Sequence, residues 1–88
     1  MVYYVADTNC GLDDYYNKAS ISVRSEKSPA DAAERLVSLV SWCRGQFKFF
    51  TVQAYDAPED GTNDIHCVKA KSCDWNELVE FANGKPLI

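Results

Sequence analysis

The pattern of apolar and polar positions predicts four β-strands, at residues 2–6, 19–25, 47–56 and 64–71. The second of them alternates cleanly, with Ile21 and Val23 on one face and Ser22 and Arg24 on the other. Successive side chains of a strand point to opposite faces, so this strand is predicted to have one buried face and one solvent-exposed face. The third segment, FKFFTVQAYD, is the longest of the four and is rich in aromatic and β-branched residues.

Helical spacing marks a fifth segment that starts at the sequence SPAD. Ser28 can accept hydrogen bonds from free backbone amides, Pro29 fits the first helical position, and Asp31 completes a short capping box. An apolar stripe at three- and four-residue spacing follows, made of Ala33, Leu36, Val37, Val40 and Cys43. Arg44 and Gly45 suit the C-terminal end, so we expect this helix to end near residue 44.

A second, shorter helix is predicted to begin near Ser72 or Asp74, where Asp74 and Glu77 have capping-box spacing. It is expected to end at Asn83-Gly84. Its predicted buried side chains are Trp75, Leu78, Val79 and Ala82.

The order of elements is therefore β-β-α-β-β-α in one domain over residues 1–88. This order predicts an α+β fold with a four-stranded, mainly antiparallel sheet and both helices packed on one face. The second and third strands flank a helix, so they are candidates for a parallel pair joined by a crossover.

Two helices on one face leave the other face of the sheet uncovered. If Phe50, Val52 and Ala54 meet the helices, alternation sends Phe47, Phe49 and Tyr55 to the opposite face, together with Tyr3 or Tyr4. Contiguous exposed aromatic side chains usually mark a binding surface.

The chain carries a formal charge of −4, and seven acidic residues lie between residues 56 and 80 against two lysines. Nucleic acid binding requires Lys and Arg to displace counterions, so this balance argues against a nucleic acid partner and for a protein with a basic surface.

The first ten residues do not resemble a secretion signal, and no segment has the roughly 20 apolar residues that span a bilayer. We therefore expect a soluble cytoplasmic protein with no membrane partner.

Metal binding is not predicted. In an EF-hand register that starts at Asp7, the sequence has Gly11, Leu12 and Lys18 where the motif requires a ligand, a glycine and a glutamate. The stretch 7–18 therefore predicts a polar connection between strands. The four cysteines have none of the spacings of local zinc sites, and Cys43 and Cys67 fall on predicted apolar faces. We expect free thiols and no cofactor.

Catalysis is the competing function class. His66 and Cys67 are neighbours on a predicted strand and point to opposite faces, so a dyad would need Cys10, Cys43 or Cys73 instead. No orienting third residue or oxyanion loop is evident. We therefore assign no catalytic residue, and keep a Cys/His enzyme or cofactor site, using Cys10, His66 or Cys73, as the alternative.

The leading hypothesis is a non-enzymatic protein-protein interaction module. A homodimer through the sheet is its simplest form, because a two-fold partner offers the same surface. In size and charge the chain is similar to phage-encoded inhibitors of bacterial defence such as anti-CRISPR proteins, and that similarity implies carboxylates that imitate nucleic acid. The predicted partner-binding residues are Tyr15, Tyr16, Phe47, Phe49, Tyr55, Glu59, Asp60 and Asp64.

Overall fold

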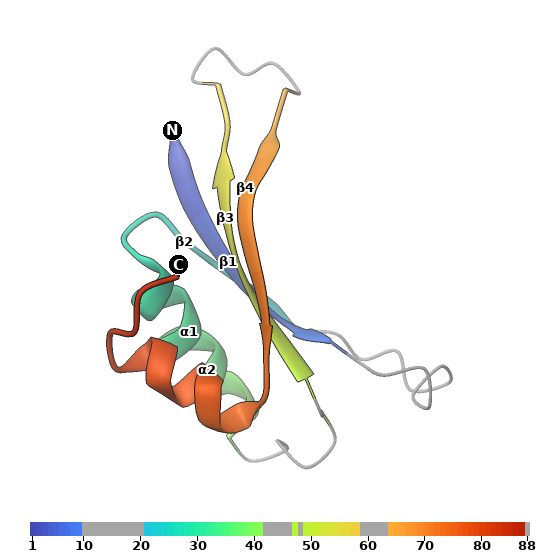
Figure 1. Ribbon diagram of the computed structural model, residues 1–88, viewed down its shortest axis with the longest axis vertical. Coiled ribbons are helices and arrows are strands. Elements are labelled where there is room, and N and C mark those ends of the chain that lie inside the picture. The colour runs from blue at the N-terminus through green and yellow to red at the C-terminus, as the bar shows by residue number, and fades with distance from the viewer. Residues whose placement is uncertain (10–20, 42–46, 48, 59–63, 88) are drawn as a thin grey trace.

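The computed structural model describes residues 1–9, 21–41, 47, 49–58 and 64–87. It contains six elements in the predicted order β-β-α-β-β-α (Figure 1). They are β1 (Val2–Asn9), β2 (Ser22–Ser25), α1 (Pro29–Val40), β3 (Phe49–Asp56), β4 (His66–Cys73) and α2 (Trp75–Ala82). The predicted α+β fold is confirmed, although β2 and β3 begin later than expected and α1 ends at Val40 rather than near residue 44.

The four strands form one sheet in the order β2-β1-β3-β4, and every neighbouring pair is antiparallel. β1 pairs with β3 along its whole length, from Val2 opposite Asp56 to Asn9 opposite Phe49. Because β1 lies between them, β2 and β3 run in the same direction without pairing. The parallel pair considered from the sequence is therefore not formed, and the α1 connection crosses over β1.

Both helices cover the same face of the sheet, as Figure 1 shows. On that face Phe50 and Val52 of β3 and Ala6 of β1 are fully buried beneath Leu36 of α1 and Leu78 of α2. The remaining members of this core are Ala32, Ala33, Val40, Phe47, Cys73, Phe81 and Leu87. Of the two faces that the sequence left open, the one with Phe50, Val52 and Ala54 meets the helices, and this settles which residues lie on the other face.

The N-caps predicted at Ser28 and Asp74 are confirmed, whereas the capping box predicted for Asp31 is wrong. Ser28 Oγ accepts a hydrogen bond from the Asp31 amide at 3.0 Å, and Asp74 Oδ1 accepts one from the Glu77 amide at 2.9 Å. The Asp31 carboxylate does not turn back to the cap; it accepts from Ser25 Oγ at 2.5 Å and from Arg35 Nε at 3.0 Å. These bonds tie the end of β2 to the first turns of α1, and the hydrogen bond from Ser25 holds the pKa of Asp31 below its ordinary value.

α2 ends in a Schellman motif, in which the Gly84 amide donates to the Phe81 carbonyl and the Lys85 amide to the Glu80 carbonyl, each at 3.0 Å. Gly84 has φ of 110°, a conformation that disfavours any side chain. The turn sends Leu87 back into the core. Leu78 is buried as predicted, whereas Phe81 is a buried residue that the predicted stripe omitted.

The sheet is longer than the helical layer. In Figure 1 the start of β1, the end of β3 and the start of β4 project beyond the helices. β4 is exposed along its length except at Cys73. In the described part of the chain, no helix has both the length and the apolar character that a membrane span requires.

Candidate functional site

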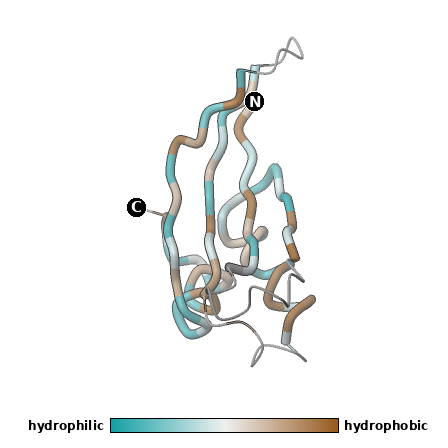
Figure 2. The backbone as a smooth tube through the Cα atoms, turned by 90° about the vertical axis from the view of Figure 1, so that its right-hand side faces the viewer, coloured by the Kyte–Doolittle hydropathy of each residue, from teal (hydrophilic) through white to brown (hydrophobic). Residues whose placement is uncertain are grey.

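The face of the sheet opposite the helices, here called the open face, is the main candidate surface. Figure 2 views the strands from the side away from the helices, and hydrophobic and hydrophilic positions alternate along them. Register and alternation assign twelve residues to the open face: Tyr3, Val5, Asp7, Ser22, Arg24, Phe49, Thr51, Gln53, Tyr55, Cys67, Ala70 and Ser72.

Three side chains from three strands form a row across this face. The guanidinium carbon of Arg24 lies 3.9 Å from the centroid of the Tyr3 ring. The Tyr3 ring stacks on Tyr55 with centroids 5.3 Å apart and planes 12° apart. Tyr3 is only 9% exposed although no helix covers it, because its neighbours in the row cover it. Packing of this kind restricts the rotation of the two rings, so they are expected to lose little rotational freedom on binding.

A chain of hydrogen bonds continues from the row along the open face. The Tyr55 hydroxyl donates to Gln53 Oε1, and Gln53 Nε2 donates to Asp7 Oδ2 at 3.0 Å. Each group of the Gln53 amide therefore has one partner, and the side chain is held in one orientation. Burial raises the pKa of Asp7 above its ordinary value, and the hydrogen bond from Gln53 opposes part of that rise. Burial likewise raises the pKa of Tyr55.

Apolar surface is exposed at the other end of the same face. Phe49 begins β3 and is 49% exposed, whereas Tyr55 lies near the end of the strand, roughly 20 Å away at the usual rise per residue. The open face thus combines an exposed aromatic ring, a polar middle and a stacked aromatic end. The central residues of protein interfaces have this mixture of aromatic, arginine and hydrogen-bonding side chains.

The predicted partner-binding residues differ in whether they are exposed, partly buried or in the core. Phe49 is exposed as expected, and Tyr55 is partly buried in the stacked row. Phe47 was wrongly assigned to the uncovered face: it is 8% exposed, and its ring centroid lies 6.4 Å from that of Phe50 in the core. The strand begins only at Phe49, so alternation does not extend back to Phe47.

Four of the other predicted residues, Tyr15, Tyr16, Glu59 and Asp60, lie outside the described residues, as do Cys10 and Cys43. Asp64 is exposed, and its Oδ1 lies 3.0 Å from Nε2 of His66. Because both side chains are more than two-thirds exposed, water screens this pair strongly.

The described cysteines do not form a site with the histidine. Cys67 was expected in the core but is exposed, whereas Cys73 is buried, and burial raises the pKa of its thiol to about 11. His66 and Cys73 occupy the two ends of β4, so they cannot form a dyad within this chain. Among the described residues, no group of three or more His, Cys, Asp or Glu side chains is arranged to hold a metal ion.

The sequence interpretation missed the partners that give the open face its order. Alternation alone placed Arg24 on a solvent-exposed face, but its contact with Tyr3 depends on the register of β2 against β1. The bond between Gln53 and Asp7 joins residues 46 apart in the sequence. Local patterns carry no information about such pairs.

No protein-family model matches the chain, and searches of curated proteins and of solved structures find no match either.

Proposed function

We propose that the chain is a non-enzymatic protein-binding module whose contact surface is the open face. One observation carries the proposal: a sheet face without a helical cover holds Arg24, Tyr3 and Tyr55 in a packed row. Side chains that are already ordered lose little entropy when a partner binds, and rigid aromatic residues with an adjacent arginine are frequent interface anchors. Exposed Phe49 adds an apolar contact at the far end of the same face.

The partner is proposed to be another protein rather than nucleic acid. The chain has a net charge of −4, and Asp7 adds a partly buried carboxylate to the open face itself. Arg24, the one base assigned to this face, already lies over Tyr3 and 3.6 Å from Glu26. Such a surface gives a phosphate backbone few free cations to bind.

Substitution of Phe49 tests this proposal. Phe49→Arg replaces a side chain that is 49% exposed on the open face by a cation. The matched control is Ile65→Arg, which makes the same change at a side chain that is 50% exposed beside the opposite end of the sheet. Proteins captured from a lysate by the parent chain are identified by mass spectrometry and then measured against both variants. Loss of capture by Phe49→Arg, with capture retained by Ile65→Arg, supports the open face as the contact surface. Unchanged capture by Phe49→Arg contradicts it.

A second candidate uses the end of the sheet that projects beyond the helices. Asp56 and Asp64 expose 60% and 75% of their side chains there, close to half-exposed Val2 and Ile65. Carboxylates beside apolar side chains suit a basic groove, so this end is the proposed contact of an inhibitor that imitates nucleic acid. Charge reversal of Glu59, Asp60 and Asp64 together is expected to abolish capture in this mode, while Phe49→Arg leaves it intact.

A further inference from the structure

The two edges of the sheet differ in how they resist the addition of another strand. β4 carries Lys69 and Lys71, both exposed, and its pairing with β3 shifts register between Ala54 and Tyr55. Lysines and bulges are common protections of an edge strand. β2 has neither lysine nor bulge, and its one charged side chain, Arg24, folds back over Tyr3.

The backbone of β2 is oriented to accept a further strand. The Thr8 amide donates to the Ile21 carbonyl at 2.9 Å, so Ile21 directs its backbone groups toward β1. Alternation in an antiparallel pair then directs those of Val23 toward β1 and those of Ser22 and Arg24 outward. Within the described part of the chain, no strand pairs with this outer edge.

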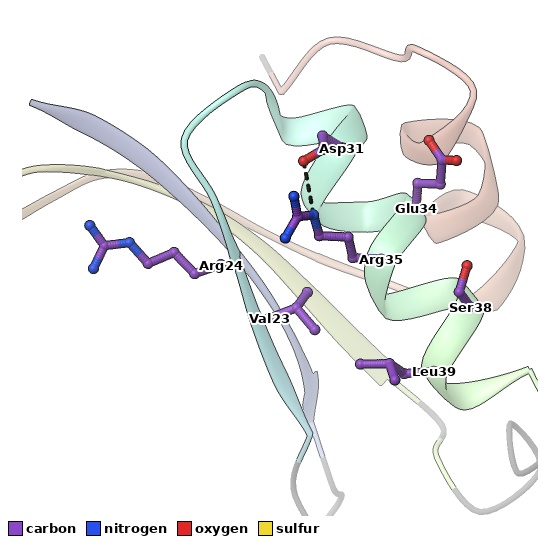
Figure 3. A pocket seen from close by; sticks show the side chains of 7 residues that line it. All are labelled: Val23, Arg24, Asp31, Glu34, Arg35, Ser38 and Leu39. Carbon is purple, nitrogen blue, oxygen red and sulfur yellow. Dashed lines mark hydrogen bonds and ion pairs between the residues drawn. The ribbon is translucent and has the colours of Figure 1, made fainter.

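A groove of about 540 Å³ adjoins the same edge, between β2 and α1 (Figure 3). Val23 points into it from the strand, and Leu39, which is 50% exposed, points into it from the helix. Arg35 also extends into the groove, where Asp31 holds its guanidinium group. The groove therefore offers two apolar side chains, Val23 and half-exposed Leu39, among polar and charged ones.

The charges around this edge are balanced. The residues that line this groove and the adjoining one include three bases, Arg24, Lys27 and Arg35, and three acids, Glu26, Asp31 and Glu34. A chain with a charge of −4 repels its own copies over most approaches. In a two-fold dimer the same surface of both copies is in contact, so that surface must be complementary to itself. With equal numbers of acids and bases at this edge, an acid of one copy can lie opposite a base of the other.

We propose that a second copy of this chain docks at this edge, with the two β2 strands antiparallel about a two-fold axis at Val23. Ser22 of each copy then pairs with Arg24 of the other through their outward backbone groups, and the two Val23 side chains meet beside the two Leu39 side chains. This register avoids placing Arg24 directly opposite its own copy. The proposal deepens the protein-binding function by naming one partner, but it uses the sheet edge rather than the open face.

Two matched proline variants test the proposed dimer. Ser22→Pro removes an outward amide from the β2 edge, and Ser72→Pro removes the corresponding outward amide from the β4 edge. The Thr8 amide faces β2, so alternation turns the backbone groups of Asp7 toward its β3 partner Thr51 and those of Thr51 toward β1. The backbone groups of Ser72, which lies opposite Thr51 on β4, therefore point outward. Light scattering is expected to show that the parent chain is a dimer over about 10 µM to 1 mM. Ser22→Pro should weaken the association about tenfold or more, whereas Ser72→Pro should leave it unchanged.

Leu39→Glu provides a variant that leaves the backbone of β2 unchanged, and it is expected to weaken the dimer as well. Amide hydrogen exchange supplies a second readout, with protection of Ser22 and Arg24 that rises with protein concentration. A parent chain that is monomeric throughout the range overturns the proposal, as does a dimer that persists in both Ser22→Pro and Leu39→Glu. Phe49→Arg leaves this edge unchanged, so failure of the open-face proposal does not affect the result.

Discussion

Replacing Tyr3 by leucine removes the central ring of the open-face row while keeping most of its apolar bulk. The ring lies 3.9 Å beneath the guanidinium carbon of Arg24 and stacks on Tyr55 with centroids 5.3 Å apart. If the row is a fixed platform, both contacts contribute to the free energy of unfolding. If the rings are merely adjacent, leucine serves almost equally well.

The expected loss follows from the two contacts. Arg24 exposes 52% of its side chain, so its cation–π contact belongs near the exposed limit of about 0.5–1 kcal/mol. Tyr3 is 9% exposed, and an aromatic pair of this kind contributes about 0.5–1.5 kcal/mol beyond its buried area. Tyr3→Leu should therefore lower the free energy of unfolding by about 1–2.5 kcal/mol, and each kcal/mol lowers Tm by about 4–8 °C for a chain of this size.

Urea unfolding of two double-mutant cycles measures each contact separately. The cycle of Tyr3→Leu with Tyr55→Leu should give a coupling of about 0.5–1.5 kcal/mol, and the cycle with Arg24→Met about 0.5–1 kcal/mol. Tyr4→Leu with Arg24→Met is the control, because Tyr4 packs against the core on the other face. Couplings below about 0.3 kcal/mol in both test cycles would refute the rigid row.

Three further predictions concern capping, ionisation and thiol reactivity. Ser28→Ala removes the acceptor of the Asp31 amide and should cost about 1 kcal/mol in urea unfolding; an unchanged midpoint would contradict the cap. Because burial raises the pKa of Asp7 above 3.8, its carboxyl adds stability at low pH that is lost as the pH rises through the folded-state pKa. Asp7→Asn should therefore be more stable than the parent at pH 7 and lose that advantage as the pH falls through the raised folded-state pKa toward 3.8; the opposite trend would contradict this sign. Peptide mapping after thiol labelling of the folded chain at pH 8 should find Cys67 modified and Cys73 protected, and rapid labelling of Cys73 would revive the enzyme alternative.

Local sequence signals predicted the elements well where one element's own residues decide its structure. The caps at Ser28 and Asp74 and the end of α2 near Asn83-Gly84 follow from side chains and backbone only a few residues apart. The same method misplaced Phe47, because alternation was extended beyond the first residue of the strand. It also missed Phe81, which packs into the core from α2.

The candidate site was predicted only in part. Alternation correctly separated Phe50 from Phe49, because successive strand residues must face opposite sides. It did not reveal that Tyr3 would be nearly covered on an open face, since that coverage comes from Arg24 and Tyr55 on two other strands. The expected free aromatic patch is accordingly smaller and more ordered than the sequence suggested.

Local sequence patterns were sufficient for the order of elements and for the N-caps of both helices, because periodicity and capping act within a few residues. The position of β1 between β2 and β3 became evident only from the folded chain, and that position brings Arg24 to Tyr3 and Gln53 to Asp7. Strand order and register are set by the packing of the whole core, since a shift of one residue would exchange the buried and exposed faces.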